Sequence, residues 1–157
     1  MKAAVVYFSA TGNTESAAKL IAAQCGGELF PISPAVPYEK ADLNWLNPLS
    51  RTTKEMHNKK SRPEILEDSA DFSGYDVVFL GFPIWWYIAP TIVNSYLESH
   101  DLAGKRIILF ATSGGSGFGK AVKHLQPSCP GAVIEEGQVF KEGFDARIVA
   151  DWVKEII

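Results

Sequence analysis

The sequence predicts an α/β fold in which helices cover both faces of a parallel sheet. Two observations support this prediction. Short apolar runs, typical of strands buried on both faces, recur along the chain, and the segments between them have helical periodicity. This alternation is typical of strands joined by crossover helices. The length of 157 residues is usual for one domain, so we expect a single domain over residues 1–157.

Three runs are the candidates for central strands, because they are apolar almost throughout and rich in β-branched and aromatic residues. They are Ala3–Phe8, Asp76–Gly81 and Arg106–Ala111. Two weaker candidates, Glu28–Ile32 and Ala132–Phe140, contain a proline or paired glutamates, which suit the edges of a sheet.

Four segments have the spacing of amphipathic helices. They are Thr14–Cys25, Ala89–His100, Phe118–Leu125 and Asp145–Ile157. Residues 33–73 interrupt the alternation, because they are polar and contain four prolines. A connection of this length is usually functional or partly disordered. It has room for a short helix around Thr53–Lys60.

Composition and charge exclude several classes of protein. The net charge of −3, without a clustered basic surplus, excludes a typical nucleic-acid binder. The first apolar run is too short for a signal peptide or a membrane span, so we expect a cytoplasmic protein with no membrane partner. Cys25 and Cys129 lie far apart and the three histidines have no ligand spacing, so we expect buried, reduced thiols and no metal site.

The loop after the first apolar run has the features of an anion site. Hydroxyl, amide and backbone N–H groups gather there at the start of a helix, where the helix dipole is positive. The residues concerned are Ser9, Thr11, Gly12, Asn13 and Thr14. The loop contains no lysine or arginine, and GxxxxGK[ST] and GxGxxG are both absent. It therefore suits one terminal phosphate monoester, and a plain helix cap is the alternative.

Two further loops follow the other central strands, at the edge where ligands bind in open parallel sheets. The loop Gly81–Pro90 contains three consecutive aromatic residues between prolines, on which a flat apolar ligand can stack. A surface for subunit contacts is the alternative interpretation. The loop Thr112–Gly119 contains four glycines, whose backbone N–H groups can approach a ligand closely, although a flexible turn would have the same composition.

Together, the three loops resemble those of the flavodoxin family, and the resemblance covers essentially the whole chain. Ser9–Thr14 matches the family's [ST]xTGNT phosphate loop, and GxPIWW with TSGGSG is similar to a bacterial subgroup. The resemblance implies a doubly wound, five-stranded sheet in the order 2-1-3-4-5 and non-covalently bound FMN. It implies phosphate ligands in the first loop, stacking by Trp85, and contacts to the flavin ring from Pro83, Ile84, Trp86, Thr112, Ser113 and Gly114, with Tyr87 and Gly115 beside them.

The resemblance also implies a redox function. We expect an FMN-binding protein that exchanges electrons with partner proteins or a small-molecule acceptor, without an acid–base pair or nucleophile of its own. The alternative is an NAD(P)H-dependent flavin enzyme, a quinone or FMN reductase on the same fold. A substrate cavity between Trp86, Tyr87 and residues 33–73 would favour this alternative.

One position departs from the family in a way that has structural consequences. Where the family often has a glycine after the stacking tryptophan, this chain has Trp86 followed by Tyr87. Positive φ costs a residue with a side chain roughly 1–2 kcal/mol. We therefore expect this pair to resist positive φ.

Overall fold

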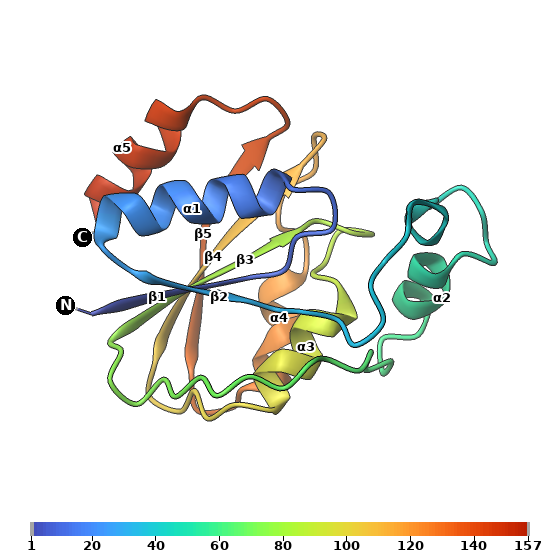
Figure 1. Ribbon diagram of the computed structural model, residues 1–157, viewed down its shortest axis with the longest axis horizontal. Coiled ribbons are helices and arrows are strands. Elements are labelled where there is room, and N and C mark those ends of the chain that lie inside the picture. The colour runs from blue at the N-terminus through green and yellow to red at the C-terminus, as the bar shows by residue number, and fades with distance from the viewer. Residues whose placement is uncertain (1, 157) are drawn as a thin grey trace.

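The computed structural model describes residues 2–156 and shows five parallel strands in one sheet, in the order β2-β1-β3-β4-β5 (Figure 1). The strands are β1 (Ala3–Tyr7), β2 (Glu28–Pro31), β3 (Val77–Pro83), β4 (Arg106–Ser113) and β5 (Val133–Lys141). The three continuously apolar runs form the centre of the sheet, and the two weaker ones form its edges. The flavodoxin-like fold predicted from the sequence is thus confirmed.

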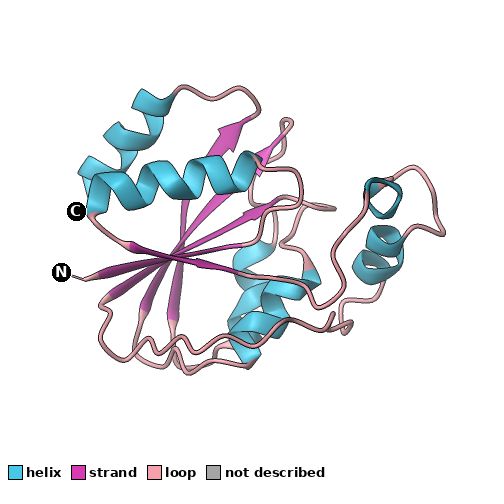
Figure 2. Cartoon of the chain, in the orientation of Figure 1, coloured by secondary structure: helices cyan, strands magenta, loops and turns pink. Residues whose placement is uncertain are grey.

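Helices cover both faces of this sheet, as Figures 1 and 2 show. On one face lie α1 (Asn13–Cys25) and α5 (Ala146–Ile156), and on the other lie α3 (Thr91–Glu98) and α4 (Ala121–Leu125), which the 3₁₀ turn η2 (Gln126–Ser128) extends. Among residues 2–156, no helix has the length and apolar character needed to cross a membrane.

Each face of the sheet has its own apolar core. On the face covered by α1 and α5, the small residues Ala17 and Ala18 of α1 are fully buried and let the α1 backbone approach the sheet. On the face covered by α3 and α4, larger residues of α3 such as Ile92 and Tyr96 fill the space between helix and sheet. Of the two cysteines, Cys129 is buried as expected, whereas Cys25 at the end of α1 is partly exposed.

Residues 33–73 contain more structure than the sequence predicts. They form the 3₁₀ turn η1 (Lys40–Leu43) and the helix α2 (Arg51–His57), which project beyond the carboxyl ends of the strands (Figure 1). We call residues 33–73 the projecting segment. The helix starts two residues earlier than Thr53 and ends three before Lys60. Ser50 sets the start, because its Oγ accepts a hydrogen bond from the backbone N–H of Thr53.

Candidate functional site

The register of the strands brings the three predicted loops together. Tyr7 of β1 pairs with Gly81 of β3, and Pro83 of β3 pairs with Thr112 of β4, so the three central strands end side by side. Beyond these pairs, the backbone N–H of Ile84 donates to the carbonyl oxygen of Thr112 at 3.0 Å. This bond holds the loop Gly81–Pro90 (the aromatic loop) against the loop Thr112–Gly119 (the glycine-rich loop).

The first loop presents free backbone donors at the start of α1. Gly12 is the N-cap with φ of +98°, a conformation that residues with a side chain rarely adopt. Its own N–H donates to Ser9 Oγ at 3.1 Å. Within residues 2–156, no group accepts a hydrogen bond from the N–H of Asn13, Thr14 or Glu15. These donors can bind an anion, which the helix dipole also favours.

The side chains of this loop fall into two groups. Thr11 and Asn13 are exposed and line a small cavity of about 170 Å³. Thr14 is buried instead, with its Oγ1 only 2.7 Å from Oγ1 of Thr112, and Ser9 binds the Gly12 N–H within the loop. Thr11 and Asn13 are therefore open to the small cavity, whereas Ser9 and Thr14 give the loop its shape.

This difference predicts different results for two threonine variants. We expect Thr11→Ala to weaken FMN binding by roughly one to two decades, because one charge-assisted hydrogen bond is worth about 1.5–3 kcal/mol. Its free energy of unfolding without ligand should stay unchanged. Thr14→Ala should lower that free energy by about 1–3 kcal/mol, because it leaves the buried Thr112 hydroxyl without its partner. Urea unfolding and calorimetric titration measure both quantities, and equal behaviour of the two variants would contradict the assignment.

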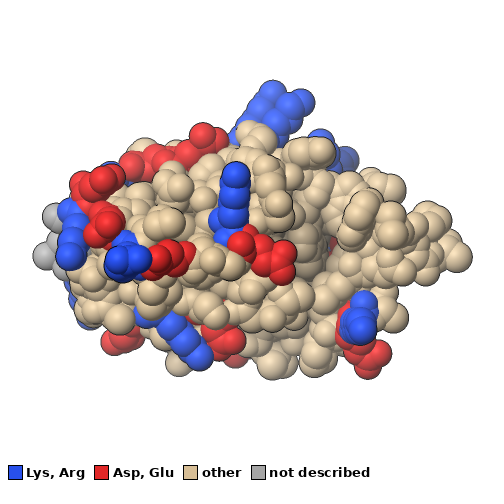
Figure 3. Space-filling model, turned by 90° about the horizontal axis from the view of Figure 1, so that it is seen from above, with Lys and Arg blue, Asp and Glu red and all other residues tan. Residues whose placement is uncertain are grey.

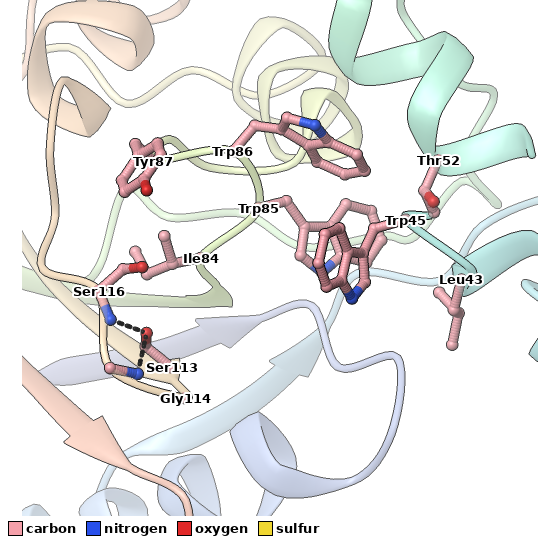
Figure 4. A pocket seen from close by; sticks show the side chains of 11 residues that line it. Leu43, Trp45, Thr52, Ile84, Trp85, Trp86, Tyr87, Ser113, Gly114 and Ser116 are labelled. Carbon is pink, nitrogen blue, oxygen red and sulfur yellow. Dashed lines mark hydrogen bonds between the residues drawn. The ribbon is translucent and has the colours of Figure 1, made fainter. Parts of the chain in front are cut away.

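A larger cavity of about 640 Å³ lies beside the small one. The aromatic loop lines it with Ile84, Trp85, Trp86 and Tyr87, the glycine-rich loop with Ser113, Gly114, Gly115 and Ser116, and the projecting segment with Leu43, Trp45 and Thr52 (Figure 4). The two cavities share Ile84, Trp85, Ser113 and Gly114. None of the residues that line the larger cavity is charged, and the smaller one has a single charged lining residue, the exposed Glu142.

Trp85 has a fixed place in the wall of both cavities. Its ring lies edge-to-face with the ring of Phe8, at 5.7 Å and 88°, and with that of Tyr38, at 5.8 Å and 72°. Such contacts hold an aromatic ring in one orientation. The indole is half-buried and lines the cavity with the rest of its surface.

The turn after Trp85 corrects the sequence prediction. Trp86 and Tyr87 both have positive φ, +48° and +64°. Trp85 and Ile88 exchange two backbone hydrogen bonds of 3.0 and 3.1 Å, so the chain makes a two-residue hairpin, and the favoured turns of this length have positive φ at one or both central residues. The buried Ile88 and a bond from the Lys120 N–H to the Tyr87 carbonyl oxygen hold the turn in place. These contacts offset a strain of about 1–3 kcal/mol for each residue.

The glycine-rich loop has a defined structure and supports that turn. Ser113 Oγ accepts hydrogen bonds from the N–H groups of Gly115 and Ser116, at 3.1 and 2.7 Å (Figure 4). At the end of the loop, Gly119 has φ of +56°, and a Cβ there would lie 2.3 Å from the Tyr87 carbonyl oxygen. The loop can therefore contact the turn this closely only because residue 119 lacks a side chain.

The sequence left open a cavity between Trp86, Tyr87 and residues 33–73, but it did not indicate which residues of that segment line it. Leu43, Trp45 and Thr52 were not predicted, because this segment has no sustained apolar stripe. The sequence signal that could have indicated them is the run of residues 43–50, which contains a tryptophan and three leucines and no charged residue.

Within residues 2–156, no group of histidine, cysteine and acidic side chains is arranged to hold a metal ion.

Comparison with known proteins gives consistent matches over the whole chain. Solved structures include proteins of Bacteroides uniformis and Bacteroides eggerthii, both described provisionally as flavoproteins. Each is 44% identical to this chain, with TM-scores of 0.91 and 0.89, and the alignments cover 98% and 99% of this chain and 97% of each of those chains. A flavoprotein of Lactobacillus acidophilus, solved in complex with FMN, is 22% identical with a TM-score of 0.71, over 96% of this chain and 97% of that chain.

The family comparison agrees with the structural one. Among curated proteins, none matches this sequence. The family model described as flavodoxin matches residues 2–156. Given this match, the sheet order and the similarity to the Bacteroides structures, the chain belongs to the flavodoxin family.

Proposed function

We propose that the protein binds FMN without a covalent bond and transfers electrons by means of it. Membership of the flavodoxin family implies this cofactor. The observation that carries the proposal is the connection between the two cavities: free N–H donors lie at one end and an aromatic pocket at the other. Such a site fits a ligand with a phosphate at one end and a flat ring at the other.

The residues present fit FMN in charge and in space. The unpaired N–H groups of Asn13, Thr14 and Glu15 suit a phosphate, and a Cβ placed on Gly12 or Gly114 would meet no atom within 4 Å. Glu142 is exposed, so solvent screens its charge. FMN supplies the redox chemistry when bound, and the protein binds it, orients it and excludes water from one side of the ring. The electrons pass to or from a partner protein or a small-molecule acceptor.

The phosphate site predicts a preference between two flavins. We expect FMN to bind at least tenfold more tightly than riboflavin, because riboflavin lacks the group that the free N–H donors bind, and one charge-assisted bond is worth about 1.5–3 kcal/mol. Calorimetric titration of the protein with each flavin measures this ratio. FMN at 100 times its Kd should raise the free energy of unfolding by about 2.7 kcal/mol. Equal affinities would rule out the phosphate site.

A second function, that of an NAD(P)H-dependent flavin enzyme, has one observation in its favour. The larger cavity extends from Trp86 and Tyr87 to the projecting segment. A reductase needs a substrate site beside the flavin, and this part of the cavity lies in the right place for one. Anaerobic mixing of the FMN-loaded protein with NADPH distinguishes the two functions. For an electron carrier, the visible flavin absorption persists with NADPH and disappears with dithionite. Loss of the absorption with NADPH alone would favour the enzyme.

A further inference from the structure

The projecting segment is fixed against the cofactor pocket by Tyr38. The Tyr38 ring contacts Trp85, and the guanidinium of Arg51 in α2 lies 3.8 Å from the centre of the same ring. The Tyr38 hydroxyl donates to Glu55, which also forms an ion pair with Arg51 at 3.1 Å. Burial, and then the bond to Glu55, raises the pKa of Tyr38, so the hydroxyl keeps the proton that it donates. Helix α2 is therefore tied to the residue expected to stack on the flavin.

Further contacts make η1 and α2 a single unit. Thr52 Oγ1 donates to the backbone carbonyl oxygen of Asp42 at 2.7 Å, which joins α2 to η1. Arg51 also donates to the Val36 carbonyl oxygen at 2.7 Å. Thr52 and Leu43 are therefore held in the wall of the cavity, and Trp45, which is 68% exposed, adds the rim of that wall two residues after η1.

This wall and the Trp86 turn enclose a part of the cavity beyond the expected place of the flavin. A flavin stacked on Trp85 and bound by the glycine-rich loop uses the side of the cavity near Ser113–Ser116. Seen from Ser113 and Ser116, Leu43 and Thr52 lie beyond Trp85 (Figure 4). Trp45 comes from the same segment as these two residues and lines the same cavity, and its ring overlaps that of Trp85 in this view. This part can hold a second ligand.

The chemistry of this region decides which ligand fits. The lining contains two indole rings and a leucine but no lysine, arginine or carboxylate. An anion would lose its hydration there without gaining a partner, which is costly, whereas a flat uncharged ring can pack against the indoles. The neighbouring run of residues 43–50 also lacks charge. On the face seen in Figure 3, most of the projecting end is formed by uncharged residues, with one group of charged side chains at its edge.

We propose that the cavity holds a second ligand beside the flavin, an uncharged planar aromatic compound that packs against Trp45 and Trp86. This inference rests on the proposed binding of FMN. It adds the class of molecule that reaches the flavin through this opening, and it assigns Trp45 and Leu43 to its binding.

The test uses two probes that differ in charge but share a ring system. Protein saturated with FMN is titrated with 2-naphthol and with naphthalene-2-sulfonate, and binding is followed by calorimetry and by the change in flavin absorption. We expect 2-naphthol to bind at least tenfold more tightly than the sulfonate. Equal binding of the two probes, or no binding of 2-naphthol, would overturn the inference.

Three variants locate the site. Trp45→Ala should weaken 2-naphthol binding at least fivefold, whereas Ile148→Ala, which removes an exposed apolar side chain from α5, should leave it unchanged. Leu43→Lys should raise the affinity for the sulfonate relative to 2-naphthol. If Trp45→Ala has no more effect than Ile148→Ala, or Leu43→Lys leaves the preference unchanged, the site lies elsewhere and the inference fails.

Titration with FMN alone separates this inference from the proposed function. If FMN does not bind, the proposed function is wrong and the inference built on it falls as well. If FMN binds but the probes do not distinguish charge or Trp45, the proposed function stands and only the second site is wrong.

Discussion

Gly119→Ala should weaken FMN binding by roughly tenfold or more, although we expect no contact between residue 119 and the flavin. A Cβ at this position would lie 2.3 Å from the Tyr87 carbonyl oxygen, which is backbone and cannot rotate away. The Trp86–Tyr87 turn would have to move, and with it the wall of the ring pocket. Positive φ at residue 119 adds a cost to the stability of the fold of roughly 1–2 kcal/mol. Calorimetry with FMN and urea unfolding of the free protein measure the two effects separately.

Two other glycines provide matched controls for this variant. Gly104 also has positive φ, +78°, but a Cβ there meets nothing within 4 Å, so Gly104→Ala should lower stability without changing FMN affinity. At Gly117 a Cβ also meets nothing within 4 Å and φ is not positive, so Gly117→Ala should change neither. If Gly119→Ala weakens FMN binding no more than Gly104→Ala does, the support of the turn by residue 119 is disproved.

Trp85→Ala should weaken FMN binding by about ten- to a hundredfold, because stacking on an aromatic side chain is worth about 1–3 kcal/mol. The variant also removes the edge-to-face contacts with Phe8 and Tyr38, so the neighbouring wall loses part of its support. The fluorescence yield of the bound flavin should change, because an indole no longer covers one face of the ring.

Trp86→Ala is the comparison for this variant. Trp86 lies one residue along the same loop, and we expect a smaller loss of FMN affinity from its removal. Fluorescence and affinity titrations of both variants decide between the two tryptophans. A large effect at Trp86 together with none at Trp85 would show that the stacking residue is misassigned by one position.

The parts of the fold that local patterns determine were predictable. The central strands are continuous apolar runs, and a parallel sheet places the ends of such strands at one edge, so the three loops could be placed together before their geometry was known. Pro31 and the Glu135-Glu136 pair likewise mark β2 and β5 as edge strands, which the sheet order confirms.

The features that depend on distant contacts were not predictable. Intrinsic preference opposes positive φ at Trp86 and Tyr87, but the Lys120 N–H and the buried Ile88 supply a tertiary context that outweighs it. Similarly, α2 is too short to show an apolar stripe, and it is held by polar contacts of Arg51 with residues 13 to 15 positions earlier in the chain. Nothing in the local sequence indicates such contacts.

The uncharged run of residues 43–50 beside the cavity has a consequence for the speed of electron exchange. Encounters between charged surfaces are accelerated by long-range attraction, and salt removes much of that acceleration. The charged residues nearest to this run, such as Lys40 and Asp42, are of opposite sign, so an uncharged molecule that approaches through this opening gains no net long-range attraction from them. Its association rate constant should therefore lie near the unsteered range of about 10⁵–10⁶ M⁻¹s⁻¹ and change little with ionic strength. Stopped-flow measurements at low and high salt would show this directly, because an uncharged electron acceptor that enters here should react equally fast in dilute and in concentrated electrolyte.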